Sequence, residues 1–258
     1  MLKGKVAVVT RSTHGAGLGI ACRLAAGGVD LAINGSDDSM AAEILREDIS
    51  NTYGIRVAFS PADVSEPCGS EMLINDVNHM LGRVDILINN VGVQHVAAEN
   101  EFPVEQWNST IARNLTAVFF TTRAVLPQMF ERDWGRIINV ASMHGPVATA
   151  NRAAYVATAH GVVGLTKFIA LETAASGITC NAICPDLLIV DRLEKLTGAI
   201  ATMDQIELAE AGARLPYEGN QPHGPRRDRL GHLARFLCSD AAACLNGVTL
   251  PVDDRWFP

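Results

Sequence analysis

The chain has 258 residues, which is enough for one large domain with a substantial hydrophobic core. Hydrophobic residues make up 48% of it and charged residues 19%, a composition that excludes a disordered protein. The net charge is −7 without any basic run, so we expect no nucleic-acid partner. No apolar stretch approaches the length of a membrane span, and no signal-peptide pattern is present. We therefore expect a cytoplasmic protein with no membrane partner.

Short apolar runs alternate with longer helical patterns along the chain. The runs predict strands at Val6–Val9, Leu31–Ile33, Val57–Phe59, Val84–Asn90, Arg136–Val140, Ile178–Ile183 and Val248–Val252. The helical patterns cover Gly15–Ala25, Ser39–Tyr53, Met72–Leu81, Val104–Phe130, with a kink or an end near Pro127, and Ala154–Ala175. This alternation predicts an α/β fold: a doubly wound parallel sheet of the Rossmann type with helices on both faces, in a single domain over residues 1–258.

The segment from residue 187 to residue 225 differs in composition from the rest. Glycine and proline cluster towards its end, at Pro216, Gly219, Pro222, Gly224 and Pro225. In a doubly wound sheet, ligands bind beyond the carboxyl ends of the strands. We therefore expect this segment to form a helical substrate lid over that edge, and we expect the site residues in the loops that follow the strands.

A glycine-rich loop, Thr10-Arg11-Ser12-Thr13-His14-Gly15-Ala16-Gly17, follows the first strand and opens the first helix. Backbone N–H groups at a helix start bind phosphate, because glycine lets the chain come close and the helix dipole favours an anion. Thr13, Gly15 and Gly17 are therefore candidate cofactor-binding residues. Glycines here also permit tight packing of helix against strand, so both explanations stay open.

The stretch from Asn139 to Lys167 carries a serine, a histidine and a tyrosine. Ser142 comes at the end of a buried strand and Tyr155 at the start of a helix, so both can face the same crevice. In this arrangement the chain resembles the short-chain dehydrogenases/reductases, which have a catalytic serine here and a Tyr-x-x-x-Lys motif. In this chain the fourth residue after Tyr155 is Ala159 instead of lysine.

The resemblance implies a role for each of these residues. Ser142 would hold the substrate oxygen, Tyr155 would pass a proton to or from it, and Asn114 would support a chain of water molecules. A lysine would favour the ionised tyrosine through its charge and would bind the nicotinamide ribose, and Ala159 can do neither. Because general acid–base catalysis is typically worth ~10²–10⁴-fold, a dehydrogenase without this lysine should be strongly impaired.

The cofactor positions of the family are partly kept. Arg11 replaces the first glycine of T-G-x-x-x-G-x-G, whereas Asp63-Val64 matches the pair that flanks the adenine, and Asn90 opens a variant of N-A-G. The second strand ends without a basic residue that would pair with a 2′-phosphate, so NAD is expected and NADP is not. Loss of cofactor binding stays an alternative.

Within the family, the chain is most similar to the branch that acts on small 3-hydroxy acids such as 3-hydroxybutyrate. That branch holds the substrate carboxylate with a glutamine, a histidine and a lysine. Gln94 and His144 match the first two, and Arg152 stands for the lysine and keeps its charge. The substrate-binding residues thus match the family's pattern better than the residues that serve hydride transfer. Among the latter, Asp186 and Val190 differ from the family.

Three functions remain open. The first is an NAD-dependent oxidoreductase of a small hydroxy or keto acid. The second is a cofactor-independent enzyme, a hydrolase, lyase or hydratase on a keto compound, that uses Ser142 and Tyr155. The third is a non-catalytic relative that binds a ligand. The resemblance also implies a homo-oligomer, a tetramer or dimer. The scattered cysteines are expected to be small buried thiols, and they predict no metal site.

Overall fold

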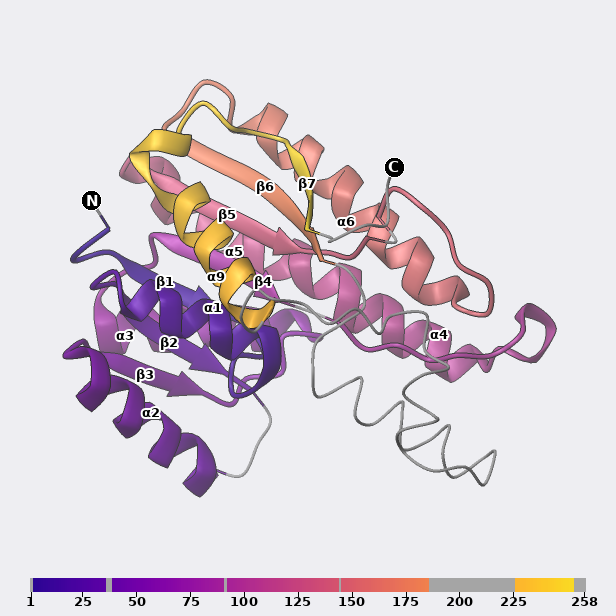
Figure 1. Cartoon of the computed structure of the whole chain (residues 1–258), viewed down its shortest axis with the longest axis horizontal. Coiled ribbons are helices and arrows are strands. Elements are labelled where there is room, and N and C mark those ends of the chain that lie inside the picture. Colours follow the sequence, from indigo (N-terminus) through magenta and orange to yellow (C-terminus); the bar gives the residue numbers. More distant parts are fainter. Residues whose placement is uncertain (1, 36–38, 91, 144, 186–225, 253–258) are drawn as a thin grey trace.

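The computed structural model describes residues 2–35, 39–90, 92–143, 145–185 and 226–252, so the predicted lid lies outside the described residues. Within these ranges, seven parallel strands form one sheet (Figure 1). They are β1 (Val6–Val9), β2 (Asp30–Asn34), β3 (Val57–Ser60), β4 (Ile86–Asn90), β5 (Gly135–Val140), β6 (Ile178–Pro185) and β7 (Thr249–Val252). Their order is β3-β2-β1-β4-β5-β6-β7, which confirms the predicted doubly wound sheet.

Helices cover both faces of this sheet, as Figure 1 shows. One face carries α1 (Gly15–Ala25), α2 (Ser39–Tyr53) and α9 (Arg226–Cys238). The other carries α3 (Pro67–Leu81), α4 (Val104–Ile111), α5 (Ala117–Glu131) and α6 (Ala153–Glu172). Short helical turns lie at η1 (Glu99–Glu101), η2 (Ala112–Thr116) and η3 (Asp240–Ala242).

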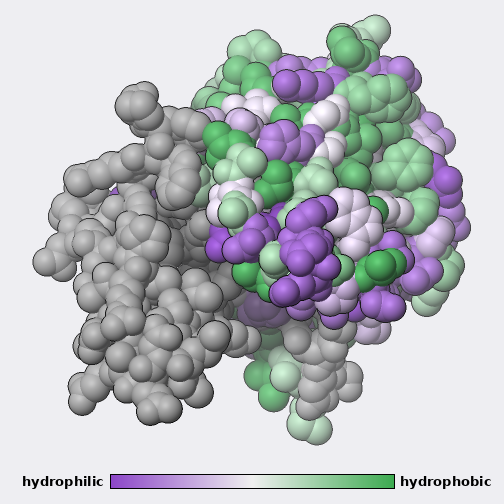
Figure 2. All heavy atoms as spheres, turned by 90° about the vertical axis from the view of Figure 1, so that its right-hand side faces the viewer, coloured by the Kyte–Doolittle hydropathy of each residue, from purple (hydrophilic) through white to green (hydrophobic). Residues whose placement is uncertain are grey.

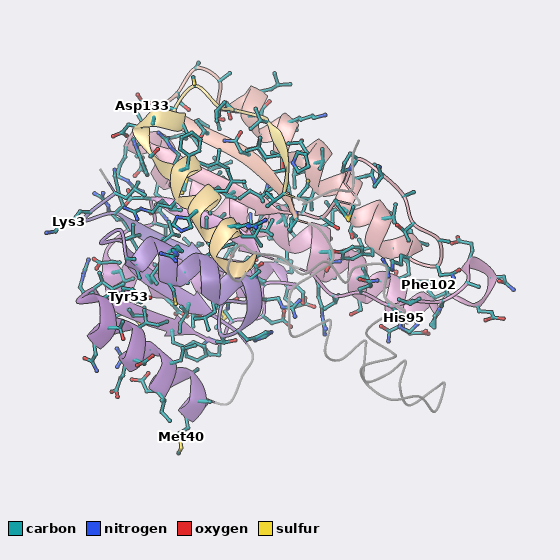
Figure 3. All side chains as sticks on the ribbon, viewed as in Figure 1. Lys3, Met40, Tyr53, His95, Phe102 and Asp133 are labelled. Atoms are coloured by element: carbon teal, nitrogen blue, oxygen red, sulfur yellow. The ribbon has the colours of Figure 1, made fainter. Side chains whose placement is uncertain are left out.

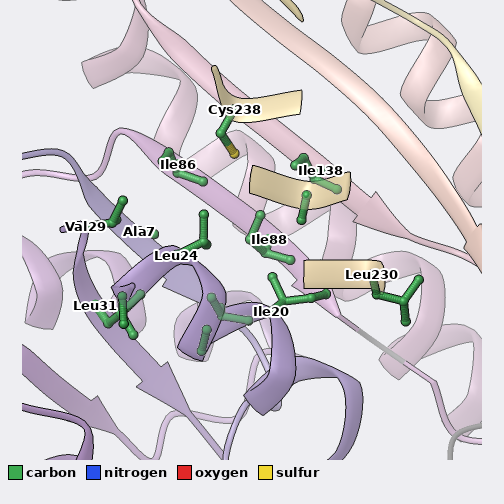
Figure 4. Packing of buried hydrophobic residues seen from close by; sticks show 14 of the residues in the cluster. Ala7, Ile20, Leu24, Val29, Leu31, Ile86, Ile88, Ile138, Leu230 and Cys238 are labelled. Carbon is green, nitrogen blue, oxygen red and sulfur yellow. The ribbon is translucent and has the colours of Figure 1, made fainter. Parts of the chain in front are cut away.

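Each face has its own hydrophobic core, because successive residues of a strand point to opposite sides of the sheet. In β1, Ala7 belongs to the core under α1 and α9, and Val8 belongs to the core under α3 and α5. Figure 4 shows the first of these cores, which Ile20 and Leu24 of α1 share with Leu230 of α9. Each such aliphatic side chain, when fully buried, stabilises the fold by ~1.5–3 kcal/mol.

The long helix predicted over Val104–Phe130 is interrupted by a π-helical turn. This turn, η2, joins α4 to α5, and α5 then continues through Pro127 to Glu131. The alternative in which the helix ends at Pro127 is therefore wrong. Pro127 and Arg123, the residue four positions before it, are both exposed, so water can bind the carbonyl that the proline leaves without a donor.

Helix α6 is long and apolar enough to cross a membrane by length and composition alone, which corrects the expectation that no stretch approaches that length. Its residues Ala159, Val162 and Ile169 are buried, and the helix packs along β6. A core helix of this kind passes the same test, so the finding is only weak evidence for a membrane span. The cytoplasmic location stays a prediction.

A buried carboxylate anchors the amino-terminal side of the sheet. Asp85, just before β4, is 1% exposed, and its Oδ2 accepts hydrogen bonds from the Val6 N–H at 2.9 Å and from Arg83 Nε at 2.8 Å. Its Oδ1 lies 3.8 Å from Arg132 Nε and 4.0 Å from Lys5 Nζ. This one anion thus joins β1, the start of β4 and the end of α5.

Candidate active site

The carboxyl ends of the strands meet at one edge of the sheet, which faces the viewer in Figure 2. Parallel pairing places Val9 beside Ile88 and Asn90 beside Val140, so the loops after β1, β4 and β5 emerge together. Polar and apolar side chains are interspersed over the described part of this surface (Figure 2). A polar surface with apolar patches suits a ligand that is itself part polar and part apolar.

The loop after β1 is held in shape by contacts within the chain. The Ser12 hydroxyl donates to the Val9 carbonyl at 2.6 Å and accepts from the Asn34 N–H at 3.1 Å. Arg11 has a φ of 48°, in the left-handed region that favours glycine, and its N–H donates to Asn34 Oδ1 at 3.3 Å. The loop therefore keeps its hydrogen bonds with an arginine in the place of the family's glycine, at a conformational cost of ~1–2 kcal/mol.

Gly17 lies where this loop, α1 and β4 come closest together. Asn90 donates its side-chain amide to the Arg11 carbonyl at 3.0 Å, and its N–H donates to Thr10 Oγ1 at 2.9 Å. A Cβ atom on Gly17 would collide with that same carbonyl oxygen and with the Asn90 amide nitrogen. Glycine at this position is therefore required by packing within the chain, whatever the loop binds.

We expect Gly17→Ala to lower the free energy of unfolding by about 1–2 kcal/mol, because the new methyl group separates Asn90 from the loop. Thermal unfolding measures this loss. Gly164→Ala in α6 is the matched control, since a Cβ there meets no atom within 4 Å and should stabilise the helix slightly. Equal stability of the two variants would show that the close approach at Gly17 is absent.

The start of α1 suits the phosphates of a dinucleotide. Its first turn contains no acidic residue, and its N-cap residue, His14, makes no side-chain capping hydrogen bond. Gly15 is buried with a φ of 60°, and the Thr13 hydroxyl lies 3.2 Å from His14 Nδ1. First-turn N–H groups without such a partner attract an anion, so these residues fit a phosphate. Their role in cofactor binding stays a prediction.

Asp63 and Val64 follow β3 at the expected adenine side of the site. The hydroxyl and the backbone N–H of Ser65 both donate to Asp63 Oδ1, at 2.7 and 2.9 Å, and these bonds lower the pKa of the Asp63 carboxyl. Val64 is buried in the core. Residues 36–38, which follow β2, lie outside the described residues, so the expected preference for NAD over NADP stays a prediction.

Three candidate catalytic residues line one small cavity at this edge. Ser142, beyond the end of β5, and Tyr155, in the first turn of α6, share it with Asn114, Thr158 and Ala159. Its volume is about 10 Å³, close to the space that one water molecule occupies. The structure thus brings together the residues that the sequence singles out for proton transfer, beside the alanine that stands where the family has lysine.

Asn114 lies in the π-helical turn and holds the segment after β4. Its Oδ1 accepts from the Val93 N–H at 2.9 Å, and its Nδ2 donates to the Val93 carbonyl at 2.9 Å. The same Nδ2 lies 3.4 Å from Thr158 Oγ1. Because π-helical turns insert one residue and redirect a side chain, this turn allows Asn114 to reach both the segment and the cavity.

Gln94, the first candidate substrate-binding residue, follows directly on Val93. Its Oε1 is buried and, among the described residues, has no hydrogen-bond partner. The neighbouring His95 packs edge-on against Phe102 with ring centroids 5.3 Å apart, and Figure 3 shows this pair at the edge of the molecule near α4. A buried polar atom without a partner is costly, which supports a ligand-binding role for the Gln94 amide.

The other two candidate substrate-binding residues, His144 and Arg152, are not seen at the Ser142 cavity. His144 lies outside the described residues. Arg152, the N-cap residue of α6, lines a groove of about 490 Å³ together with Glu99 and His160. Among the described residues that line the Ser142 cavity, Arg152 does not appear. The structure therefore groups Arg152 with the outer flank of α6.

The burial of the cysteines agrees only in part with the expectation. Burial raises the pKa of Cys184 to about 11 and that of Cys238 to about 12, and it raises the pKa of Cys180 further, so these thiols stay protonated at neutral pH. Cys68 and Cys244 are exposed, which corrects the prediction of buried thiols at these two positions.

The fold and this edge together define an enzyme of the Rossmann-type oxidoreductase class. A glycine loop opens α1, and a serine–tyrosine pair shares a cavity above β5. The family model described as short chain dehydrogenase matches residues 5–198. The chain belongs to the short-chain dehydrogenase family, which confirms the resemblance seen in the sequence.

Two relatives with assigned activities match the chain over nearly its full length. It is 47% identical over 258 residues to the D-beta-hydroxybutyrate dehydrogenase of Cupriavidus necator, and the match covers 99% of each chain. It is 38% identical over 254 residues to the D-beta-hydroxybutyrate dehydrogenase of Rhizobium meliloti, and that match covers 98% of each chain.

Proposed function

We propose that this protein is an NAD-dependent oxidoreductase that interconverts a small 3-hydroxy acid, of the 3-hydroxybutyrate type, and its keto acid. One observation carries the proposal. Ser142, Tyr155 and Asn114 line a single cavity at the carboxyl edge of the sheet. The 47% identity to a D-beta-hydroxybutyrate dehydrogenase supports the choice of substrate.

Each side chain has a defined part in the proposed reaction. The Ser142 hydroxyl donates a hydrogen bond to the substrate oxygen, and the Tyr155 hydroxyl exchanges a proton with that oxygen. A nicotinamide ring, when bound, supplies hydride acceptance or donation at the substrate carbon. The Gln94 amide is the candidate for binding the substrate carboxylate, because Arg152 lines a separate groove on the outer flank of α6.

We propose that turnover is weak. Ala159 brings no charge to the cavity, and the described residues that line it are all uncharged. The phenolate form of a tyrosine is favoured by a nearby cation, so proton transfer to Tyr155 lacks that support. The substrate can still bind, and the nucleotide lacks only the ribose contact that the family's lysine makes.

We also propose that the protein works as a homo-oligomer. Large apolar side chains are exposed on the outer helices, among them Trp107 at 38%, Phe119 at 45%, Phe168 at 55% and Leu171 at 77%. They lie on α4, α5 and α6, on the same face of the sheet. A second copy of the chain, which presents the same helices, is the partner that these exposed side chains fit.

We expect the purified protein to oxidise D-3-hydroxybutyrate slowly with NAD⁺, and Tyr155→Phe to lower kcat by about tenfold or more, because it removes the proton acceptor. Absorbance at ~340 nm measures NADH formation. Tyr53→Phe is the matched control, since Tyr53 lies on α2 outside the cavity and its loss should leave kcat unchanged. Equal rates in the two variants would contradict the assigned role of Tyr155, and absence of turnover with either NAD⁺ or NADP⁺ would contradict the proposed function.

A further inference from the structure

A groove lies at the amino edge of the sheet, opposite the edge that carries Ser142. The strand arrows in Figure 1 start at this edge, and Asp133, labelled in Figure 3, lies there just before β5. The groove has a volume of about 780 Å³, within the range of small-molecule sites. Its described lining comes from the starts of β5 and β6, the end of α6 and the segment before β7, and it shares no residue with the Ser142 cavity.

Arg136, in β5, brings a buried positive charge to this groove. It is 3% exposed, and its two hydrogen bonds to described residues both come from Nη1, to the Gly135 carbonyl at 2.8 Å and to the Gly177 carbonyl at 2.9 Å. Its Nε is buried and, within the part of the chain that the structure describes, has no acceptor. A guanidinium carries five N–H donors, so this one is incompletely satisfied by the protein. A buried cation in that state is costly, which indicates a ligand that accepts hydrogen bonds.

The charge of the groove is not balanced within the chain. Among the described residues, no carboxylate forms an ion pair with Arg136. Burial lowers the pKa of its guanidinium, and the opposite charge of Asp240 offsets this only in part. Lys167, at an exposed position of α6, lines the same groove. The described lining thus has two cations, Arg136 and Lys167, against the single anion Asp240, a net charge of +1 in a chain whose net charge is −7.

The rest of the groove offers apolar surface beside these cations. The Trp134 ring lies under the guanidinium, with its centroid 4.6 Å from Arg136 Cζ. Ala174, just after the end of α6, and Ala243, before β7, are exposed and also line the groove. An apolar surface next to a net positive charge fits a ligand with one anionic group and a short apolar body.

We infer that this groove binds a small organic carboxylate, whose charged group pairs with Arg136 and Lys167 and whose apolar body lies against Trp134 and Ala174. The planar guanidinium matches the two oxygens of a carboxylate. A carboxylate carries one negative charge, which the net charge of +1 balances, whereas a phosphate monoester carries nearly two at neutral pH. The site is separate from the proposed active site, and the inference does not depend on the proposed function.

Hexanoate is the probe for this site in solution. We expect isothermal titration of the full chain to show that it binds, and that 1-hexanol, which has the same apolar body without the charge, binds at least about tenfold more weakly. Lys167→Glu changes the net charge of the described lining from +1 to −1, so it should weaken the binding of hexanoate by about tenfold. Equal affinities for hexanoate and hexanol would overturn the inference.

Two tryptophan variants separate this groove from the active site. Ala174→Trp fills the groove and should abolish the binding of hexanoate. Ala175→Trp is the matched control, because residue 175 is the next exposed position and is not part of the described lining, and it should keep the binding. Thermal unfolding checks that both variants fold. If both bind hexanoate equally well, the ligand binds elsewhere and the inference is wrong.

Crystals soaked in 6-bromohexanoate locate the ligand directly. We expect an anomalous bromine peak in the groove, with the carboxylate beside Arg136. A peak only at the carboxyl edge of the sheet, or a peak in the groove without binding in solution, would also overturn the inference. None of these measurements needs NAD or turnover, so a failure of the proposed oxidoreductase function is distinguished from a failure of this site.

Discussion

Replacing Ala159 by lysine is expected to raise kcat for the NAD-dependent oxidation of 3-hydroxybutyrate by about 10²-fold or more. Residue 159 is 6% exposed and lines the cavity shared by Ser142 and Tyr155, so a side chain there reaches the reacting groups directly. An ammonium group close to Tyr155 favours the phenolate by its charge.

The substitution also has an unfavourable effect that has to be measured separately. A cavity of about 10 Å³ cannot hold a lysine side chain without movement of its neighbours, and overpacking of this kind typically lowers stability by ~1–3 kcal/mol. Ala159→Met has a similar volume without the charge, and thermal unfolding of the two variants isolates the packing effect. A rise in kcat in the lysine variant alone assigns the gain to the charge.

Two outcomes of this experiment are informative in different ways. If Ala159→Lys folds and binds NAD but gains nothing in kcat, the assignment of Tyr155 as the proton acceptor is wrong. If it fails to bind NAD, the strained Arg11 is the next residue to change, and Arg11→Gly should restore the glycine that its φ of 48° favours. Fluorescence titration with NADH measures binding independently of turnover.

Much of the fold could be predicted because hydrophobic periodicity follows from burial. Strands buried on both faces give continuous apolar runs, and β1, β4 and β5 were found in this way. Helix α9 was missed, although Leu230, Leu233, Ala234 and Leu237 have helical spacing, because charged residues surround them in a segment next to the Gly/Pro-rich stretch. Helix α9 packs against α1 and covers the same face of the sheet, and no local sequence pattern predicts this contact.

The positions of the candidate site residues could be predicted only where the order and direction of the strands determine them. Ser142 and Tyr155 meet because a strand end and the next helix start lie at the same edge of a parallel sheet. Arg152 lies only three residues before Tyr155, yet it lines a different groove, because it is the N-cap residue of α6 and its backbone, with φ −137° and ψ 40°, is not helical. The hydrogen bond between Asn114 and Val93 depends on a π-helical turn, and no sequence pattern in the chain predicts such a turn.

Replacing Asp85 by alanine is expected to destabilise the protein by about 3 kcal/mol, which corresponds to a fall in Tm of about 6–12 °C for a chain of this size. The carboxylate is 1% exposed and accepts two short hydrogen bonds, from the Val6 N–H and from Arg83 Nε. Its removal leaves the Val6 N–H buried without a partner and leaves several cations without their common anion.

The cations around Asp85 limit the expected loss. The side chains of Lys5, Arg83 and Arg132 are 24%, 39% and 27% exposed, so water can solvate them once the carboxylate is gone. Glu71→Ala is the matched control, because Glu71 pairs with Arg123 at 3.2 Å on an exposed surface, where such a pair is worth about 0–1 kcal/mol. A fall in Tm no larger for Asp85→Ala than for Glu71→Ala would contradict the anchoring role. Asp85→Asn, which keeps the acceptor for the Val6 N–H and removes the charge, should lie between them and so separate the hydrogen bond from the ionic attraction.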